Sequence, residues 1–224
     1  MQLFMTDKYF PQPEDFKENL CVGITGGIGS GKSVVSRILR CNGFTVYDCD
    51  SEAKKLMRND RQLKGSLIKV AGENIYDKSG ELDRFLLAAK IFSDNELRKK
   101  VNSLVHEAVR EDLSKRKKGG IFFVESAILA TGGIVPMCDM VWIVEAPDKL
   151  KMERIERRDN LSEEMILKRM KTQEREILLI PEFKRRIIRN DDKSSLINGI
   201  IGLLDELKSE NNYKTVNNNI KQLC

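Results

Sequence analysis

The chain has 224 residues, 41% of them hydrophobic and 33% charged, which is enough for a large α/β domain with insertions and a buried core. Its net charge of +5 is mild and suits an anionic small molecule; without a basic, aromatic-rich module, no nucleic acid partner is expected. No run approaches the roughly 18 apolar residues of a membrane span, and the scattered cysteines form no C-x-x-C pair, so we expect a cytoplasmic protein with reduced thiols and no membrane contact.

The first predicted elements are a strand and a helix. Residues 1–19 are mixed in polarity and are expected to form an N-terminal extension. The apolar run 20–25 is typical of a buried parallel strand. Apolar residues then recur at helical spacing until Asn42-Gly43, where we expect the helix to end: Val34, Val35, Ile38 and Leu39.

The loop between this strand and this helix fits the pattern G-x-x-x-x-G-K-[ST]. Glycines let the backbone curl around a polyphosphate with its N–H groups inward, and the helix N-terminus adds positive potential. Lys32 would reach the β- and γ-phosphates of ATP, and the Ser33 hydroxyl would hold Mg²⁺. A chance glycine-rich turn would lack the flanking strand and helix. The residues predicted to bind ATP here are Gly27, Ile28, Gly29, Ser30, Gly31, Lys32, Ser33 and Val34.

Two carboxylates follow the second predicted strand, residues 44–47. Asp48 and Asp50 lie two apart on an extended end and would point the same way. A carboxylate there can take a proton from an attacking hydroxyl, and we assign this catalytic role to Asp48. Asp50 either contacts the substrate or caps a helix that begins near Ser51.

Segment 51–118 is predicted to be mostly helical. Asp83 and Arg84 stand at one helix start and form either a cap or a grip on an anionic substrate. A capping-box match at 93–96 opens the strongest helical stripe of apolar residues, and the lone His106 lies beside it. His106 is either a packing residue or a substrate contact.

Three later strands are expected at 121–124, 140–144 and 186–189. Strands alternating with helices imply a doubly wound parallel five-stranded sheet; the sequence gives no strand order, although 2-3-1-4-5 is common in this class. Ligands bind beyond the carboxyl ends of such strands, where Glu125 and Asn190 stand. Glu125 would orient the Mg²⁺ shell or simply meet solvent.

A highly charged helical pair separates the last two strands. Arg154 and Arg158 are four residues apart and share a helix face, and Arg169 follows in the second helix. Phosphoryl transfer needs positive charge on the migrating group, which arginines on a mobile lid would supply. The alternative is an exposed helix whose Glu153 and Glu156 pair with neighbouring arginines.

In combined order and spacing, the chain resembles the dephospho-coenzyme A kinase family from about residue 20 to residue 207. The motifs that carry the resemblance are the loop phrase 24–33, Asp48-Cys49-Asp50, Leu82-Asp83-Arg84 with Ile91-Phe92, His106, Arg154…Arg158-Asp159…Arg169…Gln173 and Ile188-Arg189-Asn190-Asp191. The resemblance implies a P-loop NTPase-type α/β fold that transfers the γ-phosphate of ATP to the ribose 3′-hydroxyl of dephospho-coenzyme A. It also implies a nucleotide-binding core (20–50, 119–146 and 176–210), a helical substrate domain (51–118), a helical lid (147–175) and a tail (211–224).

The resemblance further implies roles for individual residues. The catalytic set would be Asp48 as base, Lys32, Arg154 and Arg158. The ATP site would gain Arg158, Arg169 and Asn190, the last near the adenine. The residues expected on the substrate side are Thr25, Asp48, Asp50, Asp83, Arg84, His106 and Glu125. The expected assembly is a monomer or a small homo-oligomer.

Departures from the family pattern leave rival functions open. Segment 125–131 lacks the aspartate, proline and Leu-Leu-Phe-Glu usual there, and His106 precedes Glu107 instead of proline. A kinase of another nucleoside or small metabolite would share the loop and the lid. A non-enzymatic nucleotide switch would need a guanine-reading Asn-Lys-x-Asp after the fourth strand, which residues 144–147 do not supply.

Overall fold

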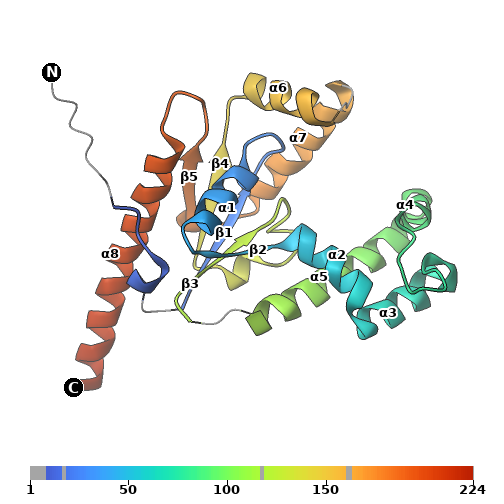
Figure 1. Cartoon of the computed structure of the whole chain (residues 1–224), viewed down its shortest axis with the longest axis horizontal. Helices are drawn as coiled ribbons and strands as arrows, with labels where there is room; N and C mark the ends of the chain where they lie inside the picture. Colours follow the sequence, from blue (N-terminus) through green and yellow to red (C-terminus); the bar gives the residue numbers. More distant parts are fainter. Residues whose placement is uncertain (1–8, 17–18, 117–118, 160–162, 224) are drawn as a thin grey trace. The chain divides into compact units, whose positions relative to one another are not determined.

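The computed structural model describes residues 9–16, 19–116, 119–159 and 163–223 (Figure 1). Its sheet has five strands in the order β2-β3-β1-β4-β5. The strands are β1 Leu20–Gly26, β2 Thr45–Asp48, β3 Ile121–Glu125, β4 Met140–Glu145 and β5 Arg185–Arg189. β1 pairs in parallel with β3 and β4, and β4 pairs in parallel with β5. The predicted parallel α/β fold is therefore confirmed, and the strand order, which the sequence does not give, is the one common in this class.

The chain divides into two compact units, and the larger one carries most of the sheet. This core unit comprises Met1–Val46 and Lys118–Cys224. Its helices are α1 Lys32–Cys41, α6 Asp148–Asp159, α7 Glu163–Leu178 and α8 Leu196–Leu223. Every residue of β1 is buried, as expected for a central parallel strand covered by helices on both faces.

The hydrophobic core of this unit joins β1 to α1 and α8. Val22, opposite Phe123 of β3, packs in one cluster with the indole of Trp142. Leu39 of α1 and Leu204 of α8 close the same cluster, and both are 0% exposed. Successive side chains of β1 point to opposite faces of the sheet, and all of them are buried. The loop therefore begins at the end of a strand that is fixed by packing on both faces.

The N-terminal segment also belongs to this core. The Phe16 ring is 3% exposed and lies 6.1 Å from the Phe44 ring, centroid to centroid. Phe10, which comes earlier in the segment, packs on the same Phe44 ring at a centroid distance of 6.4 Å. The described part of the expected N-terminal extension is therefore a layer of the core, held by aromatic contacts.

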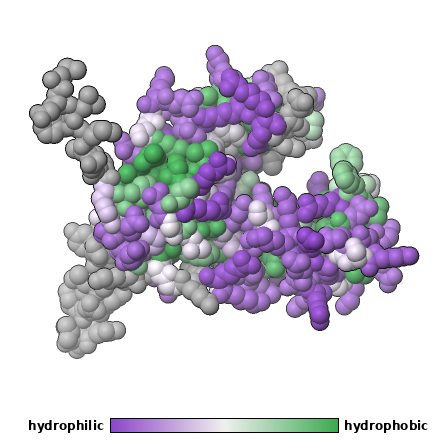
Figure 2. Space-filling view, viewed as in Figure 1, coloured by the Kyte–Doolittle hydropathy of each residue, from purple (hydrophilic) through white to green (hydrophobic). Residues whose placement is uncertain are grey.

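The second unit, Tyr47–Lys117, is helical and has its own hydrophobic core. Its helices are α2 Cys49–Asn59, α3 Arg61–Ala71, α4 Arg84–Ser93 and α5 Asn95–Arg116. α5 contacts each of the other three helices. Figure 2 shows a mostly hydrophilic surface on this unit. Its exposed apolar side chains include Phe85 and Phe92 of α4.

Two helix starts and one helix end differ from the sequence expectation. α2 begins at Cys49 instead of near Ser51, because the Asp48 carboxylate already caps it. α5 is capped by Asp94, whose carboxylate accepts the Glu96 and Leu97 N–H groups, both at 2.9 Å, whereas the capping-box match began one residue earlier. α8 continues to Leu223, through the segment expected as a frayed tail. No helix in the described ranges is long and apolar enough to cross a bilayer.

Candidate active site

The phosphate loop joins β1 to α1 and depends on glycine at two positions. Gly29 and Gly31 have φ of +76° and +96°, in the left-handed region that costs glycine little. A Cβ on Gly29 would lie 2.6 Å from the Lys151 carbonyl oxygen, and one on Gly31 would collide with the Asn190 amide. Gly27, in contrast, has no neighbour closer than 3.7 Å to such a Cβ. The loop is thus curled and closely covered.

The side chain of Lys32 folds back over the beginning of this loop. Its Nζ donates to the carbonyl oxygens of Gly26 at 2.7 Å and Gly27 at 3.2 Å. Ser33 is exposed in the first turn of α1, the positive end of the helix dipole. Ser30 is 1% exposed, and its Oγ has no hydrogen-bond partner among the described residues. The loop residues predicted from the sequence thus lie together between the end of β1 and the first turn of α1.

Arg154 of α6 links the loop to the segment that follows β5. Its guanidinium donates to the carbonyl oxygens of Gly29 and Asn190, each at 3.3 Å, and pairs with Asp192 at 2.8 Å. The Asn190 side-chain amide donates to the Ser30 carbonyl at 2.8 Å. The structure thus brings Arg154, a predicted catalytic residue, and Asn190, a predicted ATP-binding residue, together at the loop.

The second lid helix, α7, holds the loop by a side chain and by packing. Gln173 Oε1 accepts the Ile28 N–H of the loop. Beneath it, Ile155 of α6 and Ile166 of α7 are fully buried in a small apolar cluster against Ile28. Through this cluster, α6 and α7 both pack against the loop.

Further along α7, Glu176 anchors the helix to the unusual segment after β3. The carboxylate is 6% exposed and accepts the Thr131 N–H at 3.1 Å and the Thr131 hydroxyl. The residues that depart from the family pattern thus have a structural partner in α7, just beyond the segment 147–175 that was expected as the lid. The sequence analysis did not anticipate this contact, because the two residues lie 45 positions apart.

Four other predicted residues of the core unit lie in α6, α7, β1 and β3. Arg158 is exposed in α6, and the Arg169 side chain lies outside what the structure describes. Thr25 is 1% exposed within β1. Glu125 is the last residue of β3, in register with Ile24 of β1, and is half-buried.

Asp48 is the last residue of β2 and the N-cap of α2 in the helical unit. Its carboxylate accepts the Ser51 N–H at 3.1 Å and the Ser51 hydroxyl at 2.9 Å. The expectation that Asp48 and Asp50 point the same way is wrong, because Asp50 is already helical and residues two apart on a helix diverge. Asp50 is exposed in the first turn and does not cap the helix.

The remaining predicted residues of this unit lie on α4 and α5. Asp83 caps α4 by accepting the Leu86 N–H at 2.9 Å, which is the structural alternative offered for it. Arg84 is exposed beside it, and His106 is half-buried in α5. Their contribution to substrate binding stays a prediction.

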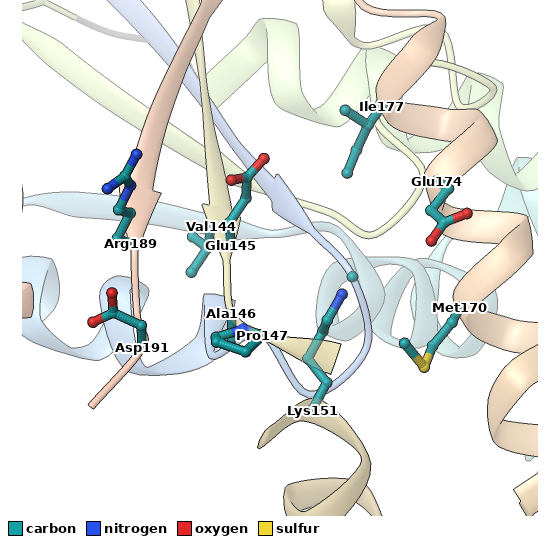
Figure 3. A pocket seen from close by; sticks show the side chains of 11 residues that line it. Val144, Glu145, Ala146, Pro147, Lys151, Met170, Glu174, Ile177, Arg189 and Asp191 are labelled. Atoms are coloured by element: carbon teal, nitrogen blue, oxygen red, sulfur yellow. The ribbon is translucent and has the colours of Figure 1, made fainter. Parts of the chain in front are cut away.

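A cavity of about 440 Å³ opens beside the loop, between α7 and the ends of β4 and β5 (Figure 3). It is lined by Gly27, Val144, Glu145, Ala146, Pro147, Lys151, Met170, Glu174, Ile177, Arg189 and Asp191. Backbone N–H groups of Ser194 and Lys193 hold the pKa of Asp191 below its ordinary value. The sequence analysis missed Lys151, although it lies three residues before Arg154 and hence near it on the helix surface.

Comparison with known proteins identifies the family. A sequence profile described as dephospho-CoA kinase matches residues 20–195. The chain belongs to the dephospho-CoA kinase family. It is 37% identical to a dephospho-CoA kinase of Porphyromonas gingivalis over 194 residues, covering 85% of this chain and 96% of the relative. It is 36% identical to a dephospho-CoA kinase of Bacteroides fragilis over 198 residues, covering 86% and 95%.

Solved structures share the fold. The crystal structure of TT1252 from Thermus thermophilus is 30% identical and has a TM-score of 0.65, covering 86% of this chain and 98% of that one. A dephospho-CoA kinase from Campylobacter jejuni is 24% identical with a TM-score of 0.58, and covers 85% and 98%; it supports the fold. The resemblance found in the sequence motifs is thus confirmed over most of this dephospho-CoA kinase family member.

Proposed function

We propose that this chain transfers the γ-phosphate of ATP to the ribose 3′-hydroxyl of dephospho-CoA, the last step of coenzyme A biosynthesis. The observation that carries the proposal is the phosphate loop, whose Lys32 lies over Gly26 and Gly27 while Arg154 contacts Gly29. A loop of this kind under a basic lid is built for a triphosphate. Membership of the dephospho-CoA kinase family names the acceptor.

The loop and the lid have separate tasks in this reaction. Loop amides and Lys32 bind the β- and γ-phosphates, while Arg154, Arg158 and Arg169 bring positive charge and exclude water. Asn190 lies at the end of the site where the adenine is expected. Ser33 fits Mg²⁺, because its exposed hydroxyl is a hard oxygen ligand and this ion is usually completed by phosphates and water. When bound, Mg²⁺ would neutralise charge on the phosphates.

Asp48 is the proposed base. Its carboxylate takes the proton of the 3′-hydroxyl while that oxygen bonds to the γ-phosphorus and the bond to the β–γ bridging oxygen breaks, releasing ADP. The two hydrogen bonds from Ser51 fix the orientation of the carboxylate. We assign the acceptor side to the remaining candidates: Thr25, Asp50, Asp83, Arg84, His106 and Glu125.

We further propose that the enzyme acts in the cytoplasm as a monomer or a small homo-oligomer, without a nucleic acid or membrane partner. Four described cysteines, Cys21, Cys41, Cys49 and Cys138, form no disulfide with one another. Free thiols are usual in a reducing compartment, and this supports the location.

The decisive experiment measures ADP release from ATP and Mg²⁺ with different acceptors. Dephospho-CoA is compared with adenosine, nucleoside monophosphates and pantothenate, and the product is analysed for its phosphorylated position. Turnover with dephospho-CoA alone, and a 3′-phosphorylated product, would establish the function. Turnover only with another acceptor would leave a phosphate-loop kinase of different specificity and would direct attention to the segment 125–131.

A further inference from the structure

Two ammonium groups flank Gly27 at the beginning of the phosphate loop. Lys32 Nζ lies 3.2 Å from the Gly27 carbonyl oxygen. On the lid side, Lys151 Nζ lies 3.8 Å from the position that a Cβ on Gly27 would take. We propose that Lys151 is a second phosphate-binding lysine, which contacts the terminal phosphate of bound ATP. This inference rests on the proposed kinase function and adds a residue to its ATP site.

The position of Lys151 is set by packing. Its Cδ is 3.7 Å from the same Cβ position on Gly27, and its backbone carbonyl lies directly over Gly29. The side chain is only 15% exposed, whereas lysine is almost always well solvated at a protein surface. The neighbouring residues Met152 and Ile155 pack against Ile28 of the loop. The lid helix therefore holds this charge at the loop before any ligand arrives.

The Gly27 end of the loop is the end that receives the terminal phosphate. The lysine of this motif reaches the β- and γ-phosphates, and Lys32 already lies against Gly26 and Gly27. Lys151, on the other side of Gly27, would therefore contact the same phosphate from the side of α6. Figure 3 shows Lys151 reaching from α6 into the cavity between the end of β4 and α7.

The ammonium group of Lys151 is paired with a carboxylate that a bound phosphate would replace. Asp148, one helical turn earlier, pairs with it at 2.6 Å, but the Asp148 side chain is 69% exposed. Because the Asp148 carboxylate is well solvated, its pairing with Lys151 contributes little, and a phosphate can replace it as the partner. Glu145, Glu174 and Asp191 line the same cavity, with Arg189 as a further cation.

The test uses calorimetric binding of Mg²⁺–ATP and Mg²⁺–ADP to the full chain without acceptor. Lys151→Met keeps the aliphatic stem over Gly27 and removes only the charge. Lys149→Met is the matched control, because Lys149 is an exposed lysine of the same helix. We expect Lys151→Met to weaken ATP binding about 10- to 100-fold, the range of one charge-assisted hydrogen bond. ADP binding, and both affinities of the control, should change less than about threefold.

The ratio of the two affinities separates a phosphate contact from a structural role. An equal loss for ATP and ADP, or an unchanged ATP affinity in Lys151→Met, would overturn the inference while the wild type still binds ATP. A wild type that binds neither nucleotide would overturn the proposed function, and the inference with it.

Discussion

At the residue scale, individual side chains, and individual glycines that lack one, decide how the candidate site is built. Gly29 and Gly31 are required by their backbone conformation and by the groups that lie over them. Asp48 combines two properties, since it caps a helix and is the proposed base. Each of these statements predicts a different result for a substitution.

Gly29→Ala should destabilise the protein, whereas Gly27→Ala should not. Alanine at Gly29 would have to adopt φ near +76° and would place its Cβ 2.6 Å from the Lys151 carbonyl oxygen. The backbone conformation alone costs about 1–2 kcal/mol. Urea unfolding should show at least this loss for Gly29→Ala and a change within about 0.5 kcal/mol for Gly27→Ala. Equal losses would mean that the loop is not covered by α6 as described.

Asp48→Asn should separate the chemistry of Asp48 from its capping role. Asparagine caps helices about as well as aspartate, so the stability should be retained. Removal of a general base should lower turnover about 10²–10⁴-fold. The matched control is Asp60→Asn, since Asp60 caps α3 by accepting the Leu63 N–H at 2.8 Å. Turnover that falls equally in both variants, or in neither, would contradict the assignment of Asp48 as base.

At the element scale, the lid helices are attached to the core by a few specific contacts. α6 and α7 share an apolar cluster with Ile28 of the loop. α7 contributes Gln173 to the loop and Glu176 to the segment after β3. Segment 125–131, which departs from the family pattern, thus holds α7 in place through the hydrogen bonds of Thr131.

Glu176→Ala should weaken the attachment of α7 to segment 125–131. The substitution removes a buried carboxylate that accepts both the N–H and the hydroxyl of Thr131. Leaving such donors without a partner costs about 1–3 kcal/mol. Urea unfolding should detect a loss of this size, whereas Glu174→Ala, at an exposed position of the same helix, should be nearly neutral. Indistinguishable unfolding curves for the two variants would show that the hydrogen bonds between Glu176 and Thr131 do not stabilise the protein.

At the scale of the whole molecule, the chain combines a sheet-based core unit with a helical unit that has its own hydrophobic cluster. The core unit extends toward the N-terminus beyond the sheet. Phe10 and Phe16 add to a chain of aromatic rings that continues through Phe44 to Phe123 and Trp142. The N-terminal segment is therefore expected to stabilise the core unit.

Phe16→Ala should lower the free energy of unfolding by about 3–5 kcal/mol, the usual cost of removing a buried phenylalanine. The Phe16 side chain is 3% exposed and contacts the Phe44 ring edge-on. Tyr9→Ala provides the comparison, because Tyr9 is 68% exposed in the same segment. Denaturant unfolding of the two variants decides the question. A loss for Phe16→Ala as small as that for Tyr9→Ala would show that the segment is dispensable.

The sequence by itself determined the elements of the fold and the family. Apolar runs of strand length and a glycine loop with fixed spacing are local patterns, and local patterns can be recognised without knowing what packs against them. The positions of the five strands and the place of Lys32 and Ser33 at the start of α1 followed from such patterns.

Only the tertiary structure decided which distant residues meet. It assigned the cap of α2 to Asp48 instead of Asp50, placed Lys151 over Gly27, and joined Glu176 to Thr131. These contacts depend on how helices are docked on a sheet, and a shift of one residue at a helix start redirects every side chain after it by about 100°. Periodicity along the chain carries no information about such contacts, because their partners lie on other elements.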